Sequence, residues 1–278
     1  LTVVCLEEGV HNLPTNVRVV SLGKKGDDLT GFIDRIRYGF QFFSLVWKLR
    51  GKYDAVFVHM NQEYVLLAGW YWRLRGTPVY LWRNHYAGTI LTNLAAVFCT
   101  KIFCTSRYSY TARFKKVVIM PAGSDIDQVQ DNNIARVPRS ILSLGRITPS
   151  KNIHVIVEAL GLLHSQGIDF TATVQGKTAL EDVAYLEGLQ TKVQQLGIGQ
   201  KVTFNAAVSE SETHDIYRAH AIFVNASPSG MLDKTIFSAS AHNCLVLASS
   251  KDFATEADPR CVFEEGSAES LSKILTVF

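Results

Sequence analysis

Apolar residues along this chain follow two alternating patterns. Short apolar runs rich in Val, Ile and Phe predict strands, and apolar positions three and four residues apart predict helices. Continuous apolar strands separated by helices are typical of parallel sheets with helices on both faces, so the fold class is α/β. The predicted strands are 2–6, 17–22, 55–59, 79–82, 101–105, 117–120, 141–145, 171–176, 201–205, 221–225 and 245–249, and the predicted helices are 30–50, 62–75, 107–115, 151–166, 180–196, 211–219 and 233–242.

The pattern is interrupted once, over residues 125–138, where Asp, Asn and Gln are in excess and no period is visible. We interpret this segment as a linker and predict two domains, 1–137 and 138–278. Each would be a doubly wound, Rossmann-like domain, and the two would face a central cleft. The chain opens inside a predicted strand and ends in a short helical run, so we expect it to be a fragment of a longer protein.

Composition excludes some classes of protein. Hydrophobic residues make up 47% and charged residues 19% of the chain, which is a globular composition. No apolar window is long enough to predict a membrane-spanning helix, and no signal peptide opens the chain. The 5 cysteines lack metal-ligand spacing, which favours reduced thiols and a cytoplasmic location. Positive charge is scattered, and no nucleic-acid-binding module is visible.

A strand-to-helix junction over residues 141–151 is the first candidate site. The predicted strand ends at Gly145, the chain turns through Arg146, and Lys151 lies where a helix with an apolar stripe begins. We expect Ser150 to be the N-cap of that helix. Free N–H groups and two cations at a helix N-terminus would bind an anion. The alternative is a solvated Arg and Lys on an ordinary loop.

A second junction of the same design follows over residues 222–234. Small residues after Asn225 allow close approach of the backbone, and a helix is expected to begin near Asp233. The N–H groups from Met231 to Lys234 would hold phosphate oxygens. The alternative is that Asp233 only caps its helix. Two such junctions, each with a lysine, favour a diphosphate site.

Taken together, these segments resemble the retaining glycosyltransferases of family 4, which have the GT-B fold. The resemblance covers most of the chain. The segments that carry it are 145–151, 202–206, 217–223 and 238–249 in the second half, and 103–106 and 120–125 in the first.

The resemblance implies transfer of a sugar from a nucleotide-diphosphate sugar to a glycan or lipid-linked acceptor, without a metal or other cofactor. Arg146 and Lys151 would neutralise the leaving diphosphate, and His85 would lie near the transferred sugar. The implied catalytic residues are therefore Arg146, Lys151 and His85. The implied donor-binding residues are Gly145, Gly176, Ser229, Gly230, Met231, Leu232, Asp233, Lys234 and Ser238.

Some of these assignments have alternatives. His85 in a loop is equally explained by hydrogen bonds to backbone, and His59, with its neighbour Glu63, has a weaker claim. The paired glutamates of the family should fall at Gly230 and Ser238, so both carboxylates are absent. Loss of the second removes a charged acceptor worth about 1.5–3 kcal/mol of nucleotide binding. The family's first strand with its glycine loop, and its terminal return helix, also lack counterparts. A non-catalytic nucleotide-sugar-binding protein and a nucleotide-sugar epimerase of the same fold therefore stay open.

Charge is divided unevenly between the halves. Residues 1–137 hold 17 Lys and Arg against 10 Asp and Glu, whereas residues 138–278 hold 11 against 15. In the first half, cations surround aromatic residues over 33–52 and 70–75. We expect the aromatic side chains to pack against the sheet. The excess cations favour contact with an anionic membrane, at its inner face.

Overall fold

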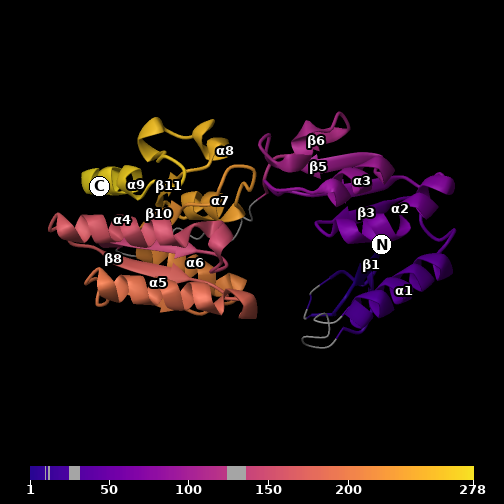
Figure 1. The fold of residues 1–278 in the computed structure, drawn as a ribbon, viewed down its shortest axis with the longest axis horizontal. Coiled ribbons are helices and arrows are strands. Elements are labelled where there is room, and N and C mark those ends of the chain that lie inside the picture. The colour runs from indigo at the N-terminus through magenta and orange to yellow at the C-terminus, as the bar shows by residue number, and fades with distance from the viewer. Residues whose placement is uncertain (10, 12, 25–31, 124–135) are drawn as a thin grey trace. The chain divides into compact units, whose positions relative to one another are not determined.

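The computed structural model describes residues 1–9, 11, 13–24, 32–123 and 136–278. Its contacts divide the chain into two compact units, coloured along the chain in Figure 1. The first unit is Leu1–Arg83 with Thr89–Ile102, and the second is Asn84–Gly88 with Phe103–Phe278. Most of the predicted linker lies outside the described residues. Its last two residues belong to a strand, so the linker prediction is wrong for Val137 and Pro138.

The first half of the chain forms two small sheets. Strands β1 (Thr2–Cys5) and β2 (Arg18–Ser21) pair with each other. A four-stranded sheet has the order β3-β4-β5-β6, in which β3 and β4 are parallel. Its strands are β3 (Val56–His59), β4 (Val79–Trp82), β5 (Lys101–Cys104) and β6 (Val117–Ile119). The helices between these strands are α1 (Phe32–Lys48), α2 (Gln62–Leu74) and α3 (Ile90–Phe98).

The second half forms a five-stranded parallel sheet with the order β11-β10-β7-β8-β9. Its strands are β7 (Val137–Leu144), β8 (Thr171–Gln175), β9 (Val202–Asn205), β10 (His220–Asn225) and β11 (Leu245–Ala248). Along the chain, β8 and β9 are added on one side of β7, and β10 and β11 are added on its other side. The strand order therefore reverses between β7 and β10, which is where doubly wound sheets bind ligands.

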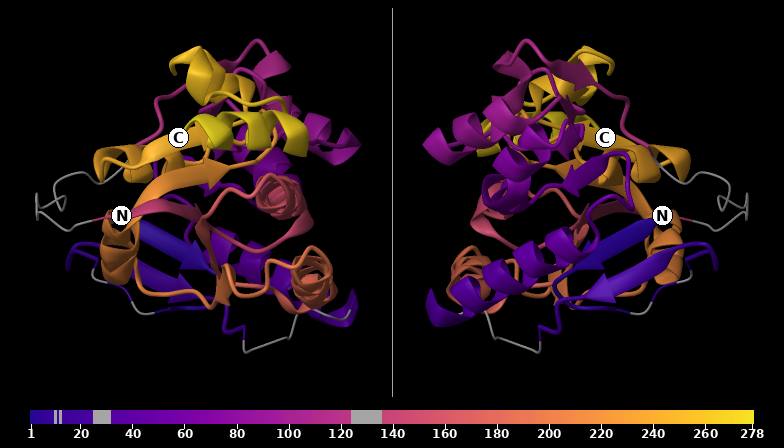
Figure 2. Two further views of the ribbon diagram at one scale, coloured as in Figure 1. Left: turned by 90° about the vertical axis from the view of Figure 1, so that its left-hand side faces the viewer. Right: turned by 90° about the vertical axis from the view of Figure 1, so that its right-hand side faces the viewer.

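Helices cover both faces of this sheet (Figure 2). Apolar side chains of α4 (Ile153–Ser165), α5 (Val183–Gln195) and α9 (Ala268–Val277) share one buried cluster with one face of the strands. Those of α6 (Glu210–Ala219) and α7 (Lys234–Ala241) share a second cluster on the other face. A short helix, α8 (Lys251–Ala254), follows β11. The α/β prediction with Rossmann-like domains is confirmed.

Three local predictions are wrong. Ser150 is not an N-cap, because residues Pro149–Lys151 form a 3-10 turn and α4 begins after Asn152, whose φ is 50°. The helix predicted over 107–115 is only a 3-10 turn at Tyr110–Arg113. Several aromatic side chains of α1 and α2 do not pack against the sheet, because they lie on the outward side of their helices. Those that are exposed are Phe40, Trp47 and Trp70.

Other sequence expectations concern cysteines and membrane spans. All 5 cysteines are free thiols. Within the described ranges, the helices are too short or too polar to cross a bilayer.

Candidate functional site

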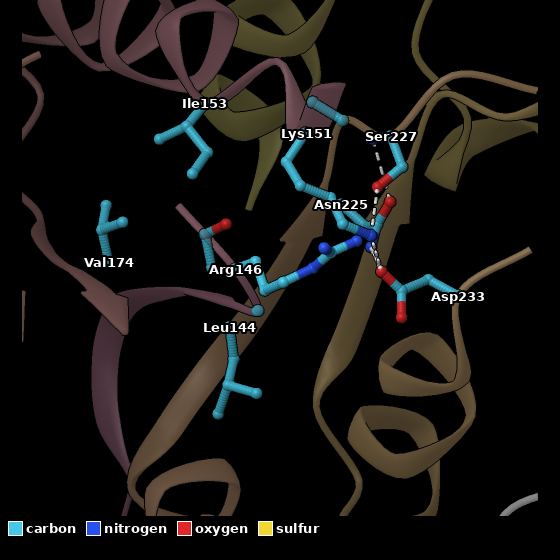
Figure 3. Close-up of a pocket in the computed structure, with 11 residues that line it drawn as sticks. Leu144, Arg146, Lys151, Ile153, Val174, Asn225, Ser227 and Asp233 are labelled. Carbon is cyan, nitrogen blue, oxygen red and sulfur yellow. Dashed lines mark hydrogen bonds and ion pairs between the residues drawn. The ribbon is translucent and has the colours of Figure 1, made fainter. Parts of the chain in front are cut away.

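A pocket opens at the carboxyl ends of β7 and β10, at the point where the strand order reverses (Figure 3). Both strands end there because glycine and small residues replace the apolar run, so the chain turns away from the sheet. Strand β7 and its following turn supply one wall, and β10 with its loop supplies the other. The lining residues are Ser143, Leu144, Gly145, Arg146, Lys151, Ile153, Val174, Asn225, Ala226, Ser227 and Asp233.

Two glycines shape the floor beside this pocket. Gly145 has a φ of 151°, a conformation that residues with a side chain rarely adopt. A Cβ atom on Gly176 would lie 1.6 Å from the carbonyl oxygen of Gly145. The N–H of Gly145 also donates to the carbonyl of Gln175, at 3.0 Å. The backbones after β7 and β8 therefore approach more closely than side chains would allow.

A lysine–aspartate pair connects the two walls of the pocket (Figure 3). The Lys151 ammonium donates to the Asp233 carboxylate and, at 3.3 Å, to the Ser227 hydroxyl. Asn225 donates from Nδ2 to the same Asp233 oxygen at 3.4 Å and accepts the Ser227 N–H at 3.0 Å. Asn152 donates to the Ala226 carbonyl at 3.1 Å, which ties the turn after β7 to the β10 loop.

The electrostatics of the pocket are dominated by this pair. The side chains of Lys151 and Asp233 are only 15% and 14% exposed. Burial raises the pKa of the Asp233 carboxyl. The charge of Lys151 and its hydrogen bond lower that pKa by more than burial raises it, so the net pKa lies below the usual value. Asp233 is therefore ionised near neutral pH and neutralises Lys151 when no anion is bound.

Arg146 leaves the pocket with an excess of positive charge. Its side chain is exposed and extends toward Asn225 and Lys151 (Figure 3). Two cations face one carboxylate, so the lining carries one net positive charge. Together with backbone N–H groups at two strand ends, such a pocket favours an anion such as a diphosphate.

Comparison with known protein families shows which family this chain belongs to. The sequence model of the family described as "Glycosyl transferases group 1" matches residues 125–275, more than half of the chain. This chain belongs to that family. It is therefore a glycosyltransferase. No match was found among curated proteins.

Solved structures similar to this glycosyltransferase share its fold. One is Anabaena Alr3699/HepE in complex with UDP and glucose, with 16% identity, a TM-score of 0.72, and coverage of 94% of this chain and 76% of that one. Another is sucrose-phosphate synthase of Thermosynechococcus elongatus, with 14% identity, a TM-score of 0.75, and coverage of 98% and 76%. The outer core galactosyltransferase WaaB has 13% identity, a TM-score of 0.64, and coverage of 95% and 76%. These likenesses confirm the GT-B fold.

The loop before α7 holds predicted donor-binding residues that do not line the pocket. The Ser229 N–H and hydroxyl donate to Glu265, at 3.1 and 2.7 Å, and the Gly230 N–H donates to Asp252 at 3.0 Å. Gly230 has a φ of 89°, which a glutamate at this position would adopt only with strain. Met231 and Leu232 are half-buried and Lys234 is exposed at the start of α7. Asp233 caps α7 by accepting the Thr235 N–H at 3.3 Å.

Ser238 lies on α7, outside the pocket lining, and is tied to a histidine pair. Its carbonyl accepts a hydrogen bond from Nδ1–H of His242 at 2.7 Å, so Nε2 of neutral His242 accepts a hydrogen bond from Nδ1–H of His214 at 2.9 Å. The His242 ring is buried and stacks on Tyr217. Burial, backed by the charges of His214, Arg218 and Arg136, lowers the pKa of His242.

The first-half histidines are held by local contacts. The Ala87 N–H donates to Nδ1 of His85 at 2.9 Å, and the ring stacks on Tyr86. The expected hydrogen bond from backbone to His85 is therefore present on one ring nitrogen. His59 is exposed and stacks on Trp82, and Glu63 is exposed in the first turn of α2.

Residue patterns alone did not single out three polar side chains of the pocket region: Asn152, Asn225 and Ser227. Asn225 ends a strand and Ser227 follows it in a loop of small residues, so strand-end position was the available signal. Asn152 gave no signal, because its contact with Ala226 joins segments 74 positions apart.

Proposed function

We propose that this glycosyltransferase moves a sugar from a nucleoside diphosphate donor to a glycan or lipid-linked acceptor. We further propose that it retains the anomeric configuration, as the family 4 enzymes that its motifs resemble do. The observation that carries the proposal is that Arg146 and Lys151, which both follow β7, line a pocket beside the ends of β7 and β10, where the strand order reverses. The description of HepE as a complex with UDP and glucose supports a nucleotide-sugar donor.

In this proposal the donor diphosphate lies against Arg146 and Lys151. Negative charge accumulates on the diphosphate as the bond from the anomeric carbon to its oxygen breaks, and the two cations stabilise that charge. The acceptor oxygen bonds to the same face of the anomeric carbon, and its proton passes to the departing phosphate oxygen. His85 orients the acceptor or the transferred sugar. No metal or other cofactor takes part.

Without bound substrate, carboxylates of the protein accept the hydrogen bonds of the N–H and ammonium groups that would contact the diphosphate. Asp233 accepts from Lys151, and Glu265 and Asp252 accept the N–H groups of Ser229 and Gly230. Donor binding would exchange these carboxylates for phosphate oxygens. The exchange retains the number of charge-assisted hydrogen bonds, so its cost is moderate. Gly145 would let the phosphate approach the backbone closely, and Gly176 would contribute by letting the turn after β8 lie against the Gly145 carbonyl. The Ser238 hydroxyl would take a weaker share in holding the ribose.

Calorimetric titration with UDP, GDP and ADP tests the donor site. We expect one of the three nucleotides to bind saturably. Lys151→Ala should weaken it roughly 10- to 100-fold, because one charge-assisted contact to phosphate is lost. Lys192→Ala is the matched control, since Lys192 is a partly exposed lysine on α5 outside the pocket. Absence of binding by all three nucleotides, or equal weakening by both variants, would contradict the proposal.

The site of the reaction in the cell is a further part of the proposal. We place it in the cytoplasm at the inner face of a membrane, where a lipid-linked acceptor would be presented. A product assay with and without added membranes checks this placement.

A further inference from the structure

Residue 230, in the loop between β10 and α7, has no room for a side chain. Gly230 has a φ of 89°, a conformation that other residues rarely adopt. A Cβ atom there would lie 2.6 Å from the carbonyl oxygen of Tyr108 and 3.0 Å from the Cα atom of Tyr86. Both neighbours are backbone atoms, so a change of rotamer cannot relieve the contact. Any carboxylate that acts at this point of the loop must therefore come from another position in the chain.

Asp252, in the first turn of α8, places a carboxylate against this loop. Its Oδ2 atom accepts the Gly230 N–H at 3.0 Å and the Ser106 hydroxyl at 2.8 Å. Ser106 is buried, and its hydroxyl oxygen also accepts the Tyr108 N–H at 2.9 Å. All of these residues belong to the second unit. The carboxylate is therefore held from two sides, by the loop before α7 and by the segment that follows β5.

The Asp252 side chain retains capacity for further hydrogen bonds. An ionised carboxylate can accept about four of them, two on each oxygen. Within the described part of the chain, the hydrogen bonds of this side chain all go to Oδ2. Asp252 is only half-buried, so a ligand can reach it. Its Oδ1 atom is therefore an acceptor that a polar ligand could use.

The loop that Asp252 contacts is part of the proposed donor site. Two of its residues, Ser227 and Asp233, line the pocket, and Gly230 lies between them in the chain. The Gly230 N–H is also one of the groups that would turn to the diphosphate. Tyr86, which lies against Gly230, directly follows His85 and stacks on its ring. Asp252 thus bonds to a loop that leads to the diphosphate cations on one side and touches the His85 segment on the other.

We infer that Asp252 binds hydroxyl groups of the transferred sugar. This inference rests on the proposed function. When a phosphate oxygen takes the Gly230 N–H, Asp252 keeps the Ser106 hydroxyl and has acceptor capacity on both of its oxygens. Hydroxyl groups that donate to a carboxylate form charge-assisted hydrogen bonds, which are roughly twice as strong as neutral ones. Because the carboxylate has two oxygens, the site favours a sugar with adjacent, unsubstituted hydroxyl groups.

A purely structural role for Asp252 is the alternative, and Glu265 provides the comparison. Glu265 accepts the N–H and the hydroxyl of Ser229, at 3.1 and 2.7 Å, so it also holds the loop before α7. In the described ranges, the hydrogen bonds of its side chain all go to Ser229. Loosening of the loop would therefore follow from loss of either carboxylate, whereas sugar binding belongs to Asp252 alone.

Calorimetric titration with nucleotides and nucleotide sugars tests this inference. The ligands are UDP, GDP and ADP, together with UDP-glucose, UDP-galactose, UDP-N-acetylglucosamine, GDP-mannose and ADP-glucose. Asp252→Asn keeps an oxygen that can accept from Ser106 and Gly230, but it removes the charge. We expect its affinity for the nucleotide to be unchanged or slightly higher, because a negative charge beside the diphosphate is lost. Its affinity for the nucleotide sugar should fall roughly tenfold. A structural defect would move both affinities in the same direction.

Two control variants and one further ligand sharpen the test. Glu265→Gln should leave the ratio of nucleotide-sugar to nucleotide affinity unchanged, and so should Asp215→Asn, whose side chain is 77% exposed on α6. Analogues of the tightest-binding nucleotide sugar that lack one sugar hydroxyl identify the contact. The parent chain should bind at least one of these analogues more weakly than the complete sugar, and Asp252→Asn should bind the two equally.

Two outcomes would overturn this inference and leave the donor site standing. One is an equal ratio of nucleotide-sugar to nucleotide affinity in Asp252→Asn and the parent chain. The other is an equal loss of nucleotide-sugar affinity in Asp252→Asn and Glu265→Gln, which would assign Asp252 to holding the loop. Failure of every nucleotide to bind the parent chain would instead contradict the proposed function, and this inference with it.

Discussion

Replacing Lys151 with methionine removes one partner of the ion pair that joins the two walls of the pocket. Breaking a buried pair in this way costs roughly 3–5 kcal/mol when the remaining charge is left alone. Here Asp233 keeps hydrogen bonds from Asn225 at 3.4 Å and Thr235 at 3.3 Å, and its side chain is 14% exposed. We therefore expect Lys151→Met to lower the free energy of unfolding by about 2–3 kcal/mol.

The reciprocal variant, Asp233→Asn, should lose less of the free energy of unfolding. In Asp233→Asn the Lys151 ammonium keeps the Ser227 hydroxyl at 3.3 Å, and its flexible stem can carry it toward water. We expect a loss of about 1–2 kcal/mol. The double variant contains neither charge, so it should be about as stable as the better single variant. The cycle should then report an interaction of about 2–3 kcal/mol between the two positions.

Urea unfolding of the four proteins, followed by circular dichroism, measures this interaction. The Asp233 pKa is lower in the folded protein, so the pair stabilises the fold above the unfolded pKa of about 3.9 and this contribution disappears as pH falls through the folded value. The difference between parent and Lys151→Met should thus be constant near neutral pH and shrink in acid. Lys192→Met, which breaks a partly exposed pair with Glu158 at 3.9 Å, should cost no more than about 0.5 kcal/mol. Additive effects of the two pocket variants would refute the reasoning.

Two other perturbations probe the second unit. Gly176→Ala places a Cβ atom against the Gly145 carbonyl and should lower the free energy of unfolding by about 3 kcal/mol or more. The control Gly188→Ala lies on an open part of α5 and should raise the free energy of unfolding by about 0.5–1 kcal/mol. Urea unfolding measures both. Equal effects of the two would contradict the close approach. Because the His242 pKa is lowered on folding, stability should fall as pH drops through the unfolded value of 6.5, by up to about 1.4 kcal/mol per pH unit. Thermal melting should show that slope reduced in His242→Gln, and an unchanged slope would exclude His242 as its source.

Much of the fold follows from local pattern. The 11 strands of the described chain all lie where apolar β-rich runs predict them, and their ends agree within a few residues, except that β7 begins four residues early. Strands such as Val79–Trp82 can be predicted because one face is buried and the other half-buried, so the whole run is apolar. The start of β7 could not be predicted, because Val137, Pro138 and Arg139 are exposed and Val137 is the only strand-forming apolar residue among them.

The sequence also predicted part of the pocket. Gly145, Arg146, Lys151 and Asp233 were all placed at strand-to-helix junctions from sequence, and the structure brings these four together. Gly145 and Arg146 follow the end of an apolar run, whereas Lys151 and Asp233 lie at the expected starts of the next helices. The order of strands, which makes the ends of β7 and β10 neighbours, has no local signal, since it depends on how helices of the chain cross the sheet.

The sequence by itself therefore determined the elements, the α/β class and the cations of the site, because these depend on residues close together along the chain. Only the tertiary structure decided which partners those residues meet. The Lys151–Asp233 pair spans 82 positions and the Asn152–Ala226 contact spans 74. It also decided that α1 turns Phe42 inward and Phe40 outward. Both rings are equally apolar, so the choice comes from how the helix lies on the sheet.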